Sequence, residues 1–470
     1  MVLAKKKVFD YLELAFKLSF LFLGFFNFNA FTFGTVVTSI LVKITVPLAG
    51  ICVLYRLFHI KHYLKDKVLI VLILFWISGM ITLLLSWEYG YMSQLKTMIW
   101  LAMQLALLYA TDIRKTTEER KKEIHLLMYV FVAFLFVSSV ASFVLMGIRY
   151  RDIRFYEGIR IVSGYIWGRL WGVYTDPNYA GVMVTISILF SLYILPSIQN
   201  RLAKGFFIAN IILQGFYICF SDSRTAMVAA FIGLAIYTYC VFFRKLTVQK
   251  TFWKSVTCVA LAVLVGIGFL ASTSAVKKGY NEIIRYVASH QTPVDPDDPD
   301  GDIEEVDPEE LLSGRTEDIE NDISNRRFDL WGSAIETFAA RPVFGVAFDS
   351  LKNFVEKNLP ETYLVNNDYG KYDNYHNTLF NILVGQGAVG FILFMIAAVM
   401  VAVRGLRVLS YHFHKENGSF YAMIFSVVAV VLVSAMFLKE LVYTLSPNTF
   451  LFWLFLGAWM REGGKKDENA

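Results

Sequence analysis

The sequence has little charge for its length. Only 18% of its 470 residues are charged, whereas 56% are hydrophobic, and the mean hydropathy is +0.51. This balance lies outside the usual range of a soluble globular enzyme. We therefore expect lipid, not water, to surround most of the chain.

Cysteine is also scarce, and its pattern excludes two kinds of site. The four cysteines show no paired spacing and have no histidine nearby. Each falls inside or at the edge of an apolar stretch, where cysteine behaves as a small hydrophobic residue. We therefore predict neither a disulfide framework nor a cysteine-bound metal at Cys52, Cys219, Cys240 and Cys258.

Several signatures of soluble enzymes are missing. The chain has no phosphate-binding glycine loop, no Cys or His metal spacing and no exposed Gly-x-Ser-x-Gly elbow. Asp-x-Asp pairs do occur near Gly301, but Pro296 takes the first ligand position of the best calcium-loop alignment. We therefore predict no bound metal and no cofactor.

Long apolar runs take up most of the chain. Runs of about 18 to 25 residues recur, and each can cross a roughly 30 Å hydrocarbon layer as a helix. Only a helix can do so with every backbone group hydrogen-bonded within the segment. We predict an all-α integral membrane protein with about twelve transmembrane helices, near residues 12–33, 35–57, 67–87, 93–111, 124–147, 177–197, 204–220, 225–243, 255–273, 379–403, 420–438 and 441–460.

The distribution of Lys and Arg predicts the topology. With the N-terminus in the cytoplasm, more than half of the 44 Lys and Arg residues fall in cytoplasmic segments. The positive-inside rule therefore favours an even number of spans with both termini in the cytoplasm. The start of the chain lacks a small-residue cleavage site and is typical of an uncleaved first span. This topology accounts for the net charge of +5, which therefore does not indicate a nucleic-acid partner.

The predicted topology divides the chain into parts of different character. Residues 1–273 form an N-terminal bundle of about nine helices, 274–376 a large extracytoplasmic loop, 377–462 about three further helices, and 463–470 a cytoplasmic tail. Only the loop is long enough for a subdomain. Its acidic residues outnumber its basic ones by about two to one.

Two segments of this loop differ in composition. The acidic insert at 293–323 is rich in Pro and Asp and poor in apolar residues, so we expect it to be disordered. Residues 326–341 have helical apolar spacing and predict an amphipathic helix on the membrane surface. Its apolar side would carry Leu330, Trp331, Ile335 and Phe338.

The most informative motif is His376-Asn377, followed after nine residues by Gly387-Ala388-Val389-Gly390. It lies at the outer end of the tenth predicted span. A histidine at a membrane surface can act as a base near neutral pH, and the glycines would let a helix or a lipid approach closely. The alternative interpretation is a histidine that only caps a helix or hydrogen-bonds a neighbour.

Arginines gather on the same predicted face. Arg224 follows a polar turn between two spans, where a guanidinium can hold a pyrophosphate through paired hydrogen bonds, or else snorkel or pair with Asp222. Arg326 and Arg327 begin the predicted amphipathic helix. Cationic side chains and helix N-terminal amides together favour an anion, unless these arginines only balance nearby aspartates.

A further arginine, Arg169, belongs to a basic and aromatic segment at 147–174. The positive-inside rule disfavours its five arginines on the outer side, which suggests an anionic ligand there. Aromatic rings in this segment could also stack on sugars. The neighbouring Asp176-Pro177-Asn178 is a helix-capping sequence, so a purely structural role for Arg169 stays open.

Taken together, these motifs resemble those of the O-antigen ligase and O-antigen/capsule polysaccharide polymerase superfamily, and the resemblance spans most of the chain. That superfamily typically has an Arg-x-x-x-Leu element, and a His-Asn/Ser/Gln element followed by Gly-x-x-Gly. Arg326 to Leu330 fits the former and His376 to Gly390 the latter, while Arg327 fits the Arg-x-x-x-Trp variant equally well. Arg224 stands where the superfamily has an outer arginine. The acidic insert departs from the pattern by lengthening the loop.

The resemblance implies a C-type membrane glycosyltransferase fold in the plasma (inner) membrane with an extracytoplasmic active site. The reaction would transfer a glycan from undecaprenyl pyrophosphate to a sugar hydroxyl, with inversion and without a metal. The implied partners are the undecaprenyl-pyrophosphate-linked oligosaccharide donor, a glycan acceptor, the lipid bilayer, a chain-length regulator and a flippase. His376 would be the base, Asn377, Gly387 and Gly390 would shape the site, and Arg224, Arg327, Arg326 and Arg169 would bind pyrophosphate.

Three functions compete for this sequence. A polymerase joins one lipid-linked repeat unit to another, and the long loop and aromatic-rich approaches favour it. A ligase instead moves the finished glycan to a lipid A core or a protein. A transporter or flippase for lipid-linked sugars would place charges near the bilayer midplane. The predicted spans carry almost no Asp or Glu there, which disfavours transport.

Overall fold

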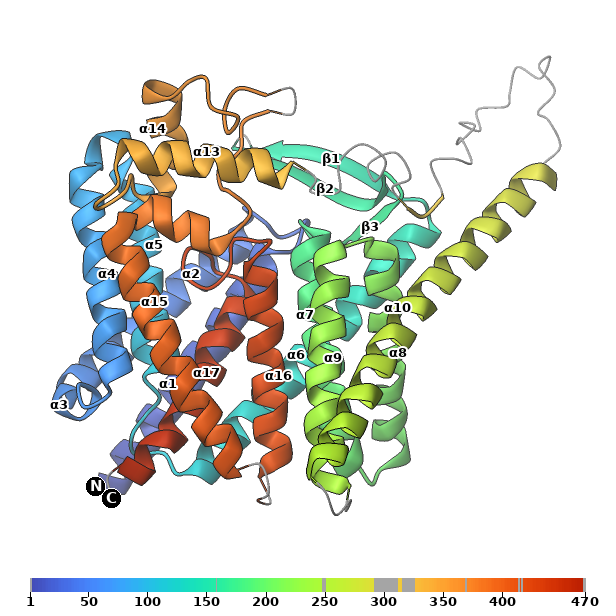
Figure 1. Cartoon of the computed structure of the whole chain (residues 1–470), viewed down its shortest axis with the longest axis horizontal. Coiled ribbons are helices and arrows are strands. Elements are labelled where there is room, and N and C mark those ends of the chain that lie inside the picture. Colours follow the sequence, from blue (N-terminus) through green and yellow to red (C-terminus); the bar gives the residue numbers. More distant parts are fainter. Residues whose placement is uncertain are drawn as a thin grey trace.

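The computed structural model describes residues 2–157, 159–246, 251–290, 312–314, 326–367, 370–412, 415 and 417–467, and it is mostly helical. Long helices lie side by side in a bundle (Figure 1). A small sheet, α13 (Arg327–Ala340) and α14 (Leu351–Asn358) lie at one end, which we call the outer end. The chain begins and ends at the opposite end of the bundle, which we call the terminal end (Figure 1). Except for residues 312–314, the predicted acidic insert at 293–323 lies outside the described residues.

Within the described part of the chain, nine helices are long and apolar enough to cross a membrane. The chain is therefore a multi-pass membrane protein, in agreement with the prediction from its apolar runs. The nine are α2 (Val36–Leu57), α4 (Lys67–Leu85), α6 (Thr117–Gly147), α7 (Pro177–Ile194), α8 (Arg201–Ser221), α9 (Arg224–Lys245), α10 (Thr251–His290), α15 (Thr378–His412) and α16 (Gly418–Ala435).

The other three predicted spans are helical but are not among these nine, so the predicted count of twelve is not confirmed. Helix α1 (Val2–Asn27) carries several charged residues. Helix α5 (Tyr91–Met103) is short and continues as the π-helix η2 (Gln104–Tyr109). Helix α17 (Pro447–Asp467) begins six residues later than predicted and ends in a charged segment.

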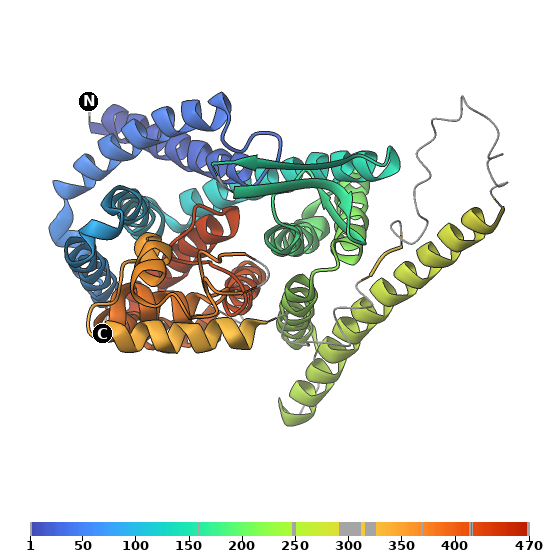
Figure 2. The same cartoon turned by 90° about the horizontal axis from the view of Figure 1, so that it is seen from above.

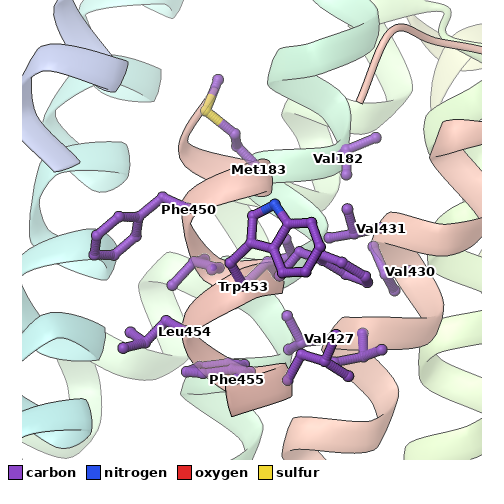
Figure 3. Packing of buried hydrophobic residues seen from close by; sticks show 14 of the residues in the cluster. Val182, Met183, Val427, Val430, Val431, Phe450, Trp453, Leu454 and Phe455 are labelled. Carbon is purple, nitrogen blue, oxygen red and sulfur yellow. The ribbon is translucent and has the colours of Figure 1, made fainter. Parts of the chain in front are cut away.

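Buried hydrophobic side chains of α7, α16 and α17 pack against one another, as Figure 3 shows. Trp453 of α17 is 2% exposed, and its indole N–H donates to the carbonyl of Leu441 at 2.6 Å. Lipid is as apolar as these side chains, so close packing, not transfer out of water, holds the helices together. Around Trp453 lie Val182, Met183, Val427, Val430, Val431, Phe450, Leu454 and Phe455.

A three-stranded antiparallel sheet covers the outer ends of α6 and α8 (Figure 2). The strands are β1 (Arg151–Tyr156), β2 (Ile159–Ile166) and β3 (Arg169–Gly172), in the order β1-β2-β3. The prediction of an all-α protein misses this sheet. Residues 312–314 dock on it, since the Gly314 N–H donates to the Gly168 carbonyl at 3.3 Å.

The described residues also form four short helical elements. They are α3 (Ile60–Tyr63), η1 (Trp87–Tyr89), η3 (Leu195–Ser197) and η4 (Phe348–Ser350). Helix α10 extends away from the bundle at its outer half (Figures 1 and 2).

The outer segment that contains α13 and α14 has a small hydrophobic core of its own. Leu330 and Ala334 of α13 are buried in it. Ile335, predicted to share an apolar side with Leu330, is 52% exposed. The buried stripe runs instead through Ser333 and Thr337, whose hydroxyls make hydrogen bonds that apolar spacing cannot reveal. The other members of this core are Tyr89, Val346, Leu351, Phe354, Val355, Leu364, Tyr375 and Val384.

Candidate functional site at the outer end

His376 lies in the segment that leads into α15. Its backbone has φ 48°, and its N–H donates to Asn374 Oδ1 at 2.7 Å. The imidazole meets the ring of Tyr372 edge-on, with centroids 6.0 Å apart, and the side chain is half-buried. Among the described residues, no group hydrogen-bonds either ring nitrogen. The unprotonated nitrogen of the neutral ring is therefore available to accept a proton from a substrate.

Asn377 caps α15. Its Oδ1 accepts from the backbone N–H groups of Leu379 at 2.8 Å and Phe380 at 3.3 Å. Its Nδ2 donates to the carbonyl of Met436 at 3.1 Å. Capping is thus done by Asn377 and not by His376, so the structure does not support the alternative that the histidine is a helix cap.

Burial, more than the surrounding charges, keeps the His376 imidazole neutral. Desolvation lowers the pKa of His376, and the positive charges of Arg327 and Lys439 lower it further. The carboxylates of Asp373 and Asp176 oppose this effect but do not outweigh it. At neutral pH the side chain is therefore unprotonated, which is the form that a general base requires.

The two cations come from segments far apart in the sequence. Arg327 is the first residue of α13, and its guanidinium lies 5.3 Å from the ring centroid of Phe437. Lys439 Nζ lies 4.8 Å from the ring centroid of Phe348. Both Phe437 and Lys439 belong to residues 436–446, the loop between α16 and α17. The fold therefore brings α13, this loop and the start of α15 together around one histidine.

The 436–446 loop is held by a buried carboxylate. Glu440 is 0% exposed, and burial raises its pKa to about 7. Its backbone N–H donates to Thr378 Oγ1 at 3.0 Å, which ties the loop to the first turn of α15. This arrangement fixes the loop that carries Lys439, whose charge acts on His376. The donors to the Glu440 carboxylate are Ser446 Oγ at 2.7 Å, Asn448 Nδ2 at 2.8 Å and Thr449 Oγ1 at 2.8 Å.

Sequence reasoning missed both Lys439 and Glu440. The predicted spans at 420–438 and 441–460 left only these two residues between them, as a short turn. The polar stretch Ser446 to Thr449 could have revealed them. It contains a proline, and its polar side chains are unfavourable in the interior of a membrane. It marks a longer loop and a later start for α17.

Two further predicted arginines, Arg224 and Arg326, lie at helix N-termini. Arg224 is the first residue of α9. Ser223 caps this helix, because its Oγ accepts a hydrogen bond from the Ala226 N–H at 3.1 Å. The preceding Asp222 forms an ion pair with Lys277. Arg326, with φ 62°, is the cap position of α13. In Figures 1 and 2 the first turn of α13 points toward the outer ends of α7 and α9.

Arg169 is buried and holds three elements together. It is 5% exposed, its Nε donates to the carbonyl of Ser221 at 2.8 Å, and its Nη2 donates to Asn178 Oδ1 at 3.2 Å. The same Asn178 oxygen accepts from Ser223 Oγ at 2.9 Å. These contacts join β3, α7 and the turn that precedes Arg224. They favour the structural alternative for Arg169 over direct pyrophosphate binding.

We expect Arg169→Gln to lower the thermal stability of the protein, with a cost on the order of 2 kcal/mol, because charged donors to buried acceptors are lost. Thermal unfolding of the purified protein measures this. Arg151→Gln is the matched control, because Arg151 is an exposed arginine of the same sheet and should leave the midpoint unchanged. An unchanged midpoint for Arg169→Gln, together with weaker donor binding, would instead support the predicted pyrophosphate contact.

Gly387 allows a close backbone approach, whereas Gly390 makes room for side chains. Helix α15 is interrupted at Gly387, where φ is 64° and ψ is −167°. The loop at 342–347 pairs with the interruption, since the Ala388 N–H donates to the Pro342 carbonyl at 2.8 Å. A Cβ on Gly387 would lie 2.4 Å from the carbonyl oxygen of Val343, and one on Gly390 would lie 2.3 Å from Gln386 Cβ. The partner of Gly387 is thus a loop of the same chain, whereas Gly390 faces the Gln386 side chain of its own helix.

The described residues contain no group of three or more His, Cys, Asp or Glu side chains that could hold a metal. The four cysteines are buried and unpaired.

Comparison with known proteins gives one family. A family model described as O-Antigen ligase matches residues 209–395, which run from α8 into α15. The match contains Arg224, Arg326, Arg327, His376 and the glycine pair, whereas Arg169 and the 436–446 loop lie outside it. A search of curated proteins found no match.

Proposed function

The chain is a multi-pass membrane enzyme with an O-antigen ligase family domain at residues 209–395, and from this premise we propose that it polymerises lipid-linked glycan repeat units. The substrates implied by the family are lipid-linked glycans within a membrane. Our proposal adds the residues that act and the choice of acceptor. The observation that carries it is the position of the His376 imidazole at the head of α15, where no described group hydrogen-bonds it and where Arg327 and Lys439 are close enough to act on its charge.

His376 acts as the general base in this proposal. A hydroxyl of the acceptor sugar attacks the anomeric carbon of the donor, and His376 takes the hydroxyl proton as the new C–O bond forms. The bond between the anomeric carbon and the pyrophosphate oxygen breaks on the opposite face. A single displacement of this kind inverts the anomeric centre.

The cations stabilise the leaving group. Negative charge develops on the pyrophosphate as it departs, and fixed positive charges in a site with little water lower the energy of that state. Arg327, Arg326 and Arg224 all lie at helix N-termini of the outer end, where backbone N–H groups add to the positive potential. We assign the pyrophosphate to this region, with Lys439 as a further cation.

The sheet at the outer end supports a polymerase over a ligase. Phe155 is 71% exposed and Trp167 is 53% exposed, and the guanidinium of Arg160 lies 5.3 Å from the Trp167 ring centroid. Exposed aromatic rings bind sugar faces by stacking. A polymerase holds one glycan as the donor and another as the acceptor. This surface is suited to bind the acceptor glycan.

The test is the glycan chain length in cells that lack the protein. Such cells are complemented with wild type, His376→Ala, Arg224→Ala or Arg327→Ala at matched membrane expression. Lys352→Ala, which removes an exposed cation of α14, is the control. We expect long chains with wild type and the control, and single lipid-linked repeats with the three variants.

Two other outcomes would change the proposal. Long chains that accumulate on the carrier lipid of cells without the protein, and never reach a final acceptor, would identify a ligase. Normal chain lengths with all three variants would show that the assigned residues do not carry the reaction.

The pH dependence of transfer should respond to Lys439. The pKa of His376 is lowered, so the base stays unprotonated at neutral pH and transfer falls only as the pH drops through that lowered value. Lys439→Gln removes a positive charge that lowers this pKa. The pKa of His376 then rises, and the acid limb of the rate profile moves to higher pH. Initial rates between roughly pH 5 and pH 8 test this. Lys352→Gln should leave the profile in place, and an unmoved limb in Lys439→Gln would contradict the assignment.

A further inference from the structure

A basic cavity lies at the terminal end, on the side of the molecule opposite His376. Its volume is about 740 Å³, within the range of small-molecule sites. It lies between the start of α4, η2, α15 and the end of α17. The cationic side chains that line it are Lys65, Lys67, Arg404, Arg407 and Arg461, and His62 lies at its edge.

The positive charge of this cavity is poorly compensated. Asp66 is the one acidic residue among those that line it. That carboxylate already accepts from the Val68 N–H at 3.1 Å, the Tyr109 hydroxyl at 3.1 Å and Arg404 Nη1 at 3.2 Å. Four further cations therefore face the same space, which makes a multiply charged anionic region of a ligand the matching partner.

Two of the arginines have donors without an acceptor. Arg404 Nε and Arg461 Nε are buried and have no hydrogen-bond partner in the described part of the chain. Buried polar groups in folded proteins are almost always hydrogen-bonded, because an unmet donor is costly. These two nitrogens are closed off from the cavity, but an anion in it would stabilise both guanidinium groups through its charge and through their other N–H groups.

One wall of the cavity is apolar and faces outward. Val399 and Val403 of α15 line it and are 59% and 47% exposed. On a membrane-spanning helix such exposed valines contact acyl chains. A small soluble phosphate would contact only the cationic part of the cavity, whereas an amphiphile would contact both the cationic part and the apolar wall. The combination therefore favours a lipid over a free phosphate.

We propose that this cavity binds the phosphate headgroup of an anionic phospholipid, with an acyl chain along Val399 and Val403. Basic pockets between transmembrane helices on the cytoplasmic side are suited to such headgroups. The positive-inside pattern predicts that the terminal end is that side. The proposal rests on no part of the glycan chemistry at the outer end.

The test compares lipid binding by the purified full-length protein. Wild type in detergent is titrated with phosphatidylglycerol or phosphatidylcholine, and retained lipid is counted by native mass spectrometry. Lys65→Gln/Arg407→Gln removes two exposed cations of the cavity, and Arg201→Gln/Lys204→Gln removes two exposed cations at the start of α8 as the matched control. We expect wild type and the control to retain phosphatidylglycerol, and the cavity variant to bind it at least about tenfold more weakly.

Three results would overturn the proposal. Equal retention of the two lipids by wild type would remove the selectivity for an anion. Undiminished phosphatidylglycerol binding by the cavity variant, with an unchanged unfolding temperature, would place the lipid elsewhere. Binding of inorganic phosphate or glycerol 3-phosphate as tight as that of phosphatidylglycerol would identify a soluble phosphate as the ligand.

Discussion

His376→Ala is expected to lower the rate of glycan transfer by about a hundred- to ten-thousandfold, the usual contribution of a general base. The rate is measured with purified protein in liposomes that contain the lipid-linked donor and acceptor. The loss should fall mainly on the maximal rate, since the proton moves only as the new bond forms. Arg327→Gln should behave similarly, because its charge acts on the leaving group.

His290→Ala is the matched control for this prediction. His290 is an exposed histidine at the outer end of α10, and its replacement should leave transfer unchanged. The unfolding temperature of His376→Ala should also equal that of wild type, because no described group bonds to the imidazole nitrogens. A variant that is stable and retains more than about a tenth of the rate would exclude His376 as the base.

The transmembrane part of the fold is well predicted by the sequence because its signal is local. A run such as Lys67–Leu85 has a mean hydropathy of 2.8, and only a helix can carry such a run across lipid. The shorter or more polar helices are harder to assign. Helix α1 contains Glu13 and Lys17, which are buried and form ion pairs with Arg56, Lys115 and Glu123 of other segments, contacts that the sequence alone does not reveal.

The sheet at the outer end illustrates a weaker signal. Residues 151–172 contain β-branched and aromatic residues and a Glu157-Gly158 step, but the strands are short and flanked by strong helical runs. Hairpin formation there also depends on Gly164 and Gly172, which have positive φ and lie opposite each other in the register. Such pairing depends on contacts between strands, and those are not evident from hydropathy.

Two residues of the candidate site could be singled out from the sequence, because they belong to recognisable motifs. His376 and Arg327 stand out in the sequence, and the structure places them within electrostatic reach of each other. Lys439 does not stand out, because it follows a long apolar run and precedes an acidic residue. Its role depends on the buried Glu440 and on the hydrogen bond to Thr378, which only the folded chain brings together.

Gly387→Ala is expected to destabilise the protein by about 2 to 4 kcal/mol. The backbone at Gly387, with φ 64° and ψ −167°, lies in a region that is essentially restricted to glycine and costs other residues about 1 to 3 kcal/mol. The added Cβ would also lie 2.4 Å from the Val343 carbonyl oxygen, which is backbone and cannot turn aside.

The loop at 342–347 would then separate from α15, and the contact of Thr82 Oγ1 with the Phe344 carbonyl at 2.6 Å would weaken with it. This loop follows α13 directly, so Arg327 would lose its fixed place beside His376 and transfer would fall together with stability. Gly332→Ala is the control, because that glycine lies within α13 with open space around its Cα, and alanine there should stabilise by up to about 1 kcal/mol. The measurements are the unfolding temperatures of both variants and their transfer rates, each compared with those of wild type. Equal unfolding temperatures for the two would mean that α15 is continuous through Gly387, and that the loop reaches the site by another route.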